Sequence, residues 1–172
     1  MRTGLDVSPT AATSIRPHLS WAFASLALVE LSLACAVWRL GRRALGSLHG
    51  LSAAEWVIFG ALCAAFVYGE GYLALHRRFA PHVVARAFLL TGERTLYKVL
   101  GPAFIVSLVG DRWASQLKAA LGVCAIVAAA LAVRALPEPW RAMTDGAVSA
   151  ALLLGLVSMI GHSCKAWVRT RR

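Results

Sequence analysis

Long apolar runs constrain this chain more than any other feature of its sequence. Hydrophobic residues make up 59% of its 172 positions, against about 45–50% in an average soluble domain. A hydrocarbon core about 30 Å thick needs about 20 helical residues, and four stretches of the chain reach that length with few charges. Because lipid cannot hydrogen-bond to the backbone, such stretches must be helical. The sequence therefore predicts an all-α fold, an integral membrane helical bundle.

The chain divides into three predicted regions. Residues 1–19, rich in Ser, Thr and Pro, are predicted as a flexible N-terminal tail, residues 20–164 as the transmembrane bundle, and residues 165–172 as a basic C-terminal tail. A basic linker from Arg39 to His49 joins the first two spans, and a short turn from Pro137 to Trp140 joins the last two. The predicted spans are Trp21–Leu40, Ala54–Leu75, Gln116–Leu136 and Arg141–His162.

Rows of small side chains four residues apart mark helix faces that can approach one another closely. One such row lies in the last predicted span and is expected to be a packing seam. Shorter rows in the second span also allow close approach, but such rows are common in membrane helices and indicate little by themselves. The rows are Ala147, Ala151 and Gly155 in the last span, and Gly60 with Ala64 and Ala61 with Ala65 in the second.

A basic segment at about residues 77–112 separates the second span from the third. Within it, Val99–Gly110 is apolar for only 12 residues and contains Gly101-Pro102. That length is short of a span and suits an interfacial or re-entrant segment. We expect Val83–Leu90 to form a helix lying on or against the bundle. The alternative is a fifth span in this region.

The positions of arginine and lysine discriminate between four and five spans, because short cytoplasmic loops are enriched in these residues. With four spans, 13 of the 18 basic residues lie on one side of the membrane and 5 on the other. With five spans, the same residues divide nine to nine. The asymmetry favours four spans, with the N- and C-termini cytoplasmic in a bacterial-type inner (plasma) membrane.

The net charge of +10 comes from basic residues that flank apolar segments rather than from a stripe on a soluble face. Anionic lipid headgroups attract such residues, so membrane lipids are expected partners, together with other membrane helices or a second copy of the chain. No nucleic acid is expected. The predicted headgroup contacts in the central segment are Arg77, Arg78, Arg86, Arg94 and Lys98.

Three polar residues inside the predicted spans are candidates for function. Glu30 is near the centre of the first span, where a carboxylate costs roughly 3 kcal/mol and usually faces the bundle interior. It is either a proton-relay or ion-coupling group, or a neutral carboxylic acid hydrogen-bonded to a serine or carbonyl of a neighbouring helix. Glu70 and Tyr72 lie toward the end of the second span, where Tyr72 shares a helix face with His76 and Glu70 does not.

Two histidines, His76 and His162, end different spans at a similar depth in the four-span arrangement. Histidines on separate helices can hold a haem or a metal ion, and histidine is otherwise common at membrane interfaces. No other cofactor is expected. The sequence contains no phosphate-binding loop, nucleophile elbow, HExxH or CxxC motif.

These features favour a non-enzymatic accessory or assembly subunit of a membrane complex, because the spans hold few polar groups and no catalytic pattern. A proton or small-solute carrier that uses Glu30 is the alternative. A lipid-acting enzyme or a haem-binding redox protein that uses His76 and His162 is a further alternative, so the sequence leaves open whether the protein is an enzyme.

Overall fold

The structure, a computed structural model, describes residues 16–89, 101–106 and 113–170. All elements in these ranges are helices, and four of the helical stretches are long and apolar enough to cross a membrane. The predicted all-α fold with four spans is therefore confirmed. The elements are α1 (Arg16–Ser47), η2 (Leu48–Gly50), α2 (Ala53–Phe66), η3 (Val67–Phe79), α3 (Ala80–Leu89), α5 (Gly101–Ile105), α6 (Trp113–Arg134) and α7 (Trp140–Thr170).

The observed helices extend beyond the predicted spans. α1 begins at Arg16 and continues through the predicted basic linker, which shrinks to the 3-10 turn η2 and the two residues after it. Arginine is a good helix former and its long stem can lie along apolar surface, so the charges of the predicted linker do not end the helix. α7 likewise runs on to Thr170, through most of the predicted C-terminal tail. Residues 1–15 of the predicted N-terminal tail lie outside the described residues.

The second span also continues past its predicted end. α2, η3 and α3 form one uninterrupted helical segment from Ala53 to Leu89, in which η3 has the wide turns of a π-helix. Pro81 is the second residue after these turns. Proline lacks an N–H and its ring clashes with the carbonyl four residues earlier in an α-helix, and wider turns relieve that clash. The part of the predicted interfacial segment before Leu89 is therefore a continuation of the second span rather than a separate element.

The start of α2 is fixed by a capping box. The hydroxyl of Ser52 accepts a hydrogen bond from the backbone N–H of Glu55, and the Glu55 carboxylate accepts one from the backbone N–H of Ser52, at 2.7 Å. These reciprocal bonds satisfy two backbone donors that a helix start leaves unpaired. The sequence Ser52-Ala-Ala-Glu55 therefore sets where the second span begins.

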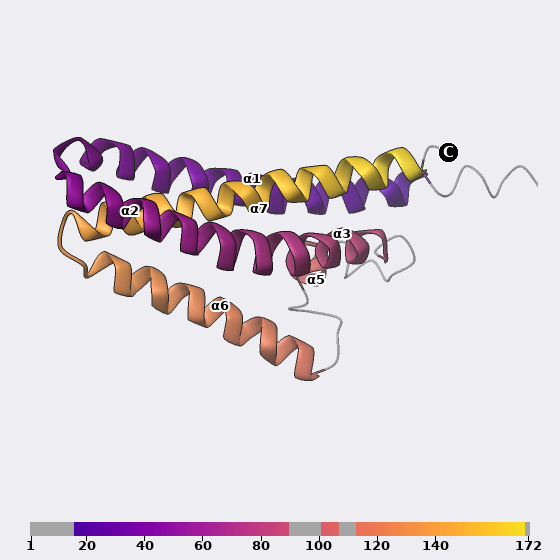
Figure 1. Ribbon diagram of the computed structural model, residues 1–172. Helices are drawn as coiled ribbons and strands as arrows, with labels where there is room; N and C mark the ends of the chain where they lie inside the picture. Colours follow the sequence, from indigo (N-terminus) through magenta and orange to yellow (C-terminus); the bar gives the residue numbers. More distant parts are fainter. Residues whose placement is uncertain (1–15, 90–100, 107–112, 171–172) are drawn as a thin grey trace, which may run out of the picture.

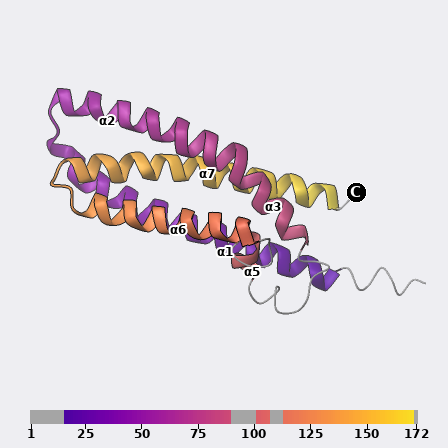
Figure 2. The ribbon, with the colours of Figure 1, turned by 90° about the horizontal axis from the view of Figure 1, so that it is seen from below.

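α7 is the central helix of the bundle, because it packs against α1 on one side and against α2, η3 and α3 on the other. Figure 2 shows α7 between the α2–α3 segment and α1. The predicted seam on α7 is confirmed, since Ala147, Ala151 and Gly155 are all buried. A Cβ built on Gly71 of η3 lies 3.1 Å from the Ala151 carbonyl oxygen, and one built on Gly155 lies 3.0 Å from Cβ of Leu75.

The small residues of the second span, whose spacing would allow close helix approach, are not buried against another helix within the described part of this chain. Gly60, Ala61, Ala64 and Ala65 are all exposed, and a Cβ on Gly60 meets nothing within 4 Å. The close approach to α7 occurs farther along the helix, at Gly71. The spacing of small residues identified faces capable of close packing, whereas the crossing geometry decided which face is used.

A second packed region lies where α1, α3, α5 and α7 meet. Val83 and Ala87 of α3 are fully buried there, so α3 packs against the bundle as expected of Val83–Leu90. Ile105 of α5 is also fully buried in this cluster. The remaining part of the predicted segment Val99–Gly110 lies outside the described residues.

α6 stands apart from this bundle. In Figure 1 it meets α7 at the turn that joins them and diverges from the other helices toward Trp113. None of its 22 residues is buried. Figures 1 and 2 also place the beginning of α1 and the end of α7 at the same end of the molecule, with η2 and the α6–α7 turn at the other. Four passes connected in this order account for that arrangement.

Candidate functional site

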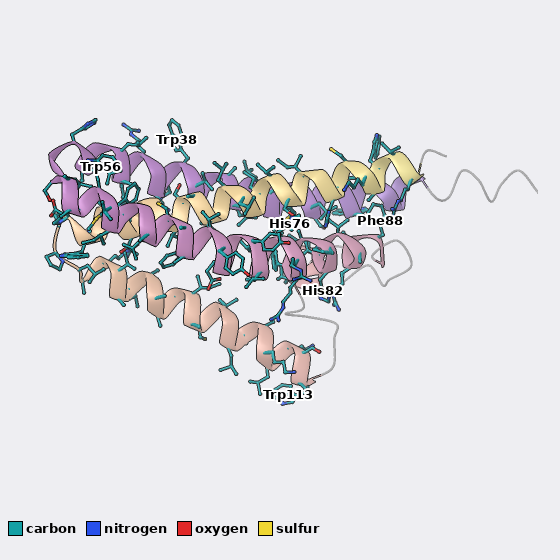
Figure 3. All side chains as sticks on the ribbon, in the orientation of Figure 1. Trp38, Trp56, His76, His82, Phe88 and Trp113 are labelled. Atoms are coloured by element: carbon teal, nitrogen blue, oxygen red, sulfur yellow. The ribbon has the colours of Figure 1, made fainter. Side chains whose placement is uncertain are left out.

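A polar cluster forms where η3 passes α7. Nδ1 of His76 and the hydroxyl of Ser158 are 2.7 Å apart and share a hydrogen bond. Ser158 is buried on α7, because Gly155 one turn earlier lets the two helices approach closely. The hydrogen bond satisfies a hydroxyl that would otherwise be buried without a partner. Figure 3 places His76 on the side of its helix that faces α7.

Aromatic rings extend the cluster along η3. The His76 ring is stacked on Tyr72, with centroids 5.4 Å apart, and Tyr72 is stacked on Tyr68 at 6.1 Å. The ring of His162, on α7, lies 6.0 Å from that of His76. The two histidines predicted to share a depth therefore lie side by side. The predicted common face of Tyr72 and His76 is confirmed by their stacking.

Glu30 lies on the other side of α7. The hydroxyl of Ser163 donates a 2.8 Å hydrogen bond to Oε1 of Glu30, which joins α1 to α7. Glu30 is thus hydrogen-bonded to a serine of a neighbouring helix. This is the contact expected of Glu30 as a neutral carboxylic acid, the alternative to a proton-relay group. Because Ser163 follows His162 directly, the Glu30 contact and the histidine pair sit at one level of α7, on two of its faces.

Glu70 is separated from this cluster. It lines a cavity of about 500 Å³ between α1, α2–η3, α6 and α7, together with residues of all these helices. His76 and His162 do not line that cavity. Glu70 thus faces the cavity whereas His76 contacts α7, as expected if the two lie on different faces of their helix.

Sequence reasoning missed three residues of the cluster, namely Tyr68, Ser158 and Ser163. A signal for the two serines was present, because hydroxyls inside an apolar span and close to a histidine are candidates for hydrogen bonding across helices. Tyr68 is four residues before Tyr72 and so shares its helix face, and this spacing could have identified it. Which of these side chains meet was decided by how the helices cross.

The predicted lipid contacts are only partly within the described residues. Arg77 and Arg78 are exposed at the end of η3, and Arg86 of α3 is half-buried. Arg94 and Lys98 lie outside the described residues. Exposed arginines on a membrane helix can extend their guanidinium groups to the headgroup region, so their contact with lipid stays a prediction.

The described residues contain no group of three or more His, Cys, Asp or Glu side chains placed to hold a metal ion. His76 and His162 supply two nitrogen ligands between them, fewer than the three or four of protein zinc sites. Two histidines are enough for the axial positions of a haem. The cavity between the helices, however, is not bordered by either ring, so haem forms no part of the function proposed below.

The fold and its polar cluster define a class: this is a small α-helical protein with four candidate membrane helices, the architecture of a multi-pass membrane protein. No protein-family model, curated protein or solved structure matches the chain.

Proposed function

We propose that this protein is a non-enzymatic accessory or assembly subunit of a membrane complex, in which α6 binds a helix of a partner protein. The observation that carries the proposal is the exposure of α6. It is long and apolar enough to span a membrane, yet no residue of its span is buried within the chain. By comparison, 28% of the most apolar part of the span formed by α7 is buried.

The composition of α6 favours a protein partner over lipid alone. Helices in a membrane associate mainly by close packing, and small residues at the interface allow that packing. Ala120, Cys124 and Ala128 are spaced at i, i+4 and i+8 and are all exposed. They form a row on the side of α6 opposite the cavity, which is lined by Ala130 and Val133. We call the row Ala120–Cys124–Ala128 the outer face of α6.

The same proposal includes a bacterial-type inner membrane and cytoplasmic termini. Its support is the distribution of charge, because the four-span order assigns 13 of 18 basic residues to the side that holds both termini. The described ends of α1 and α7 lie together, in agreement with an even number of passes.

Site-specific photo-crosslinking in native membranes tests the outer face. A photoreactive residue at Ala128 is expected to give one discrete adduct heavier than the 18.3 kDa chain, identified by mass spectrometry. The matched control carries the same residue at Val133, on the cavity side of the same helix, and is expected to give no such adduct. An adduct of twice the chain mass would identify a second copy and refute a heteromeric role. No protein adduct from Ala128 would mean that lipid covers the outer face.

A second candidate function is proton transfer across the membrane, and the polar cluster favours it. Glu30, Ser163, the two histidines and Ser158 bring titratable and hydroxyl groups from three helices to one level of α7. Chains of carboxylate and imidazole groups inside membranes are typical of proton relays. The hydrogen bond to Ser163 is also what a structural carboxylic acid forms, so the cluster alone does not separate the two roles.

Proton flux into liposomes under an imposed pH gradient separates them. If the protein carries protons, Glu30→Gln should abolish the flux, and His162→Gln should reduce it. Glu70→Gln is the matched control, because Glu70 is also a carboxylate inside a span but lines the cavity rather than the cluster. Equal flux through the native protein and the Glu30→Gln variant would rule out proton transfer and leave Glu30 a structural group.

A further inference from the structure

The cavity between α1, α2–η3, α6 and α7 combines an apolar wall with a basic rim. Its volume is about 500 Å³, within the range of about 300–1,000 Å³ that small-molecule sites occupy. Most of its lining is aliphatic or aromatic. Characteristic wall residues from the four helical segments are Leu40, Phe66, Leu75, Ile126, Val133 and Leu152.

The rim is made of four arginines from three helices. Arg39 and Arg43 lie near the end of α1, Arg134 is the last residue of α6, and Arg141 is in the first turn of α7. All three helix ends are at the same end of the molecule (Figure 1). Helix ends rich in arginine mark the level of lipid headgroups. The basic rim is therefore placed where a headgroup lies, and the apolar wall extends from it toward the membrane interior.

The charges of the basic rim are not balanced within the cavity. Asp145 lies within electrostatic range of Arg141, Arg43 and Arg134, and Glu70 is the other carboxylate of the lining. Four arginines thus face two carboxylates. Among the described residues, none of the four guanidinium groups forms an ion pair or a hydrogen bond with another side chain. Within the part of the chain that the structure describes, the basic rim therefore has more positive than negative charge and guanidinium N–H groups that are open to a ligand.

We propose that this cavity binds an anionic phospholipid, with the phosphate on the basic rim and an acyl chain against the apolar wall. Charge complementarity carries the assignment, because guanidinium groups bind phosphate oxygens in paired hydrogen bonds. Basic pockets between membrane helices hold lipid headgroups in the same way. The site is distinct from the outer face of α6, which lies on the other side of that helix, and it does not depend on the proposed subunit role.

A lipid fits this cavity better than a water-soluble anion. A free phosphate would occupy only the rim and leave the apolar wall in contact with lipid or detergent from outside. An amphiphile uses both parts at once. The bound lipid would also fill the space between α6 and the rest of the chain, and so would set the angle at which α6 presents its outer face.

Native mass spectrometry of the purified protein in detergent tests the proposal by titration with dioleoyl phosphatidylglycerol and dioleoyl phosphatidylcholine. These lipids share their acyl chains and differ in net headgroup charge. We expect one phosphatidylglycerol to bind per chain, about thirtyfold more tightly than phosphatidylcholine, because two arginines are in excess of the lining carboxylates and each contributes about 1 kcal/mol near an anionic headgroup. Arg43→Gln combined with Arg134→Gln should remove that preference. Inorganic phosphate should not compete at concentrations comparable to the lipid.

Two pairs of variants make the test specific. Arg77→Gln combined with Arg78→Gln removes two arginines that do not line the cavity. Their predicted contacts are with the surrounding headgroups rather than with the lipid in the cavity, so the preference for one bound phosphatidylglycerol should stay intact. Ala130→Phe fills the cavity and should weaken the binding of both lipids, whereas Ala128→Phe, on the outer face, should not. Equal binding of the two lipids by the native protein would overturn the proposal, as would equal losses in the Arg43/Arg134 and Arg77/Arg78 variants. Competition by inorganic phosphate would show an anion site that needs no acyl chain. Thermal melts of each variant verify that it is folded.

Discussion

The contact between η3 and α7 at Gly71 offers the sharpest test of the packing described here. A Cβ at this position would lie 3.1 Å from the carbonyl oxygen and 3.3 Å from Cα of Ala151, both backbone atoms of α7. A rotamer change cannot relieve contacts with backbone atoms, so Gly71→Ala must shift the two helices apart by a few tenths of an ångström. Two residues earlier in the same helix, a Cβ on Gly69 meets nothing within 4 Å.

These two glycines form a matched pair for measuring the steric cost. Alanine is favoured over glycine in a helix by about 1 kcal/mol, and this gain applies to both substitutions. Overpacking a well-packed contact costs about 1–3 kcal/mol, and this cost applies only to Gly71. We therefore expect Gly69→Ala to stabilise the protein slightly and Gly71→Ala to be less stable than Gly69→Ala by about 1–3 kcal/mol.

Reversible unfolding by sodium dodecyl sulfate in mixed micelles, followed by circular dichroism, measures both free energies of unfolding. The Gly71→Ala protein should also have a longer hydrogen bond between His76 and Ser158, since that bond lies beyond the contact on the same two helices. Equal free energies of unfolding for the two variants would refute the close approach of η3 to α7. They would also remove the structural basis for the polar cluster.

Three further predictions test neighbouring features. Gly155→Ala should be less stable than Gly161→Ala by about 1–3 kcal/mol, because a Cβ on Gly155 would collide with Leu75 of η3 whereas one on Gly161 has open space. The same detergent unfolding measures both. Ser158→Ala should cost about 1 kcal/mol through loss of its hydrogen bond, and an unchanged His76 imidazole NMR signal in this variant would contradict the contact. Ser52→Ala should cost about 0.5–2 kcal/mol by removing the capping box of α2, and faster amide hydrogen exchange confined to the first turn of α2 is the expected signature.

Much of the secondary structure followed from the sequence because the physical cause is local. An apolar run in a membrane must hydrogen-bond its own backbone, so composition alone predicted four spanning helices. Helix ends were less predictable. Arg39 and Arg43 read as a linker but lie in α1, and Arg77 and Arg78 read as the start of an interfacial segment but lie in η3. A charged residue lowers the hydropathy of a segment without breaking its helix. Hydropathy therefore predicted that the first and second helices end earlier in the chain than they do.

The polar residues of the site were predictable by type, whereas their contacts were not. Glu30, Tyr72, His76 and His162 were identified because polar groups are costly inside a span. The partners of two of them, Ser163 and Ser158, lie 133 and 82 residues away in the chain. No local pattern encodes a contact at such separations, because it depends on where two helices cross.

The sequence by itself determined the fold class, the number of spans and the small-residue seam of α7, since each depends on residues close together in the chain. Only the tertiary structure decided that α7 is central, that α6 stands apart, and that arginines from three helix ends surround one apolar cavity. The physical reason lies in the membrane itself, which requires helices but lets their apolar faces contact lipid or protein alike. The choice between those contacts is made by side-chain shape, at positions such as Gly71 and Gly155 where two helices meet.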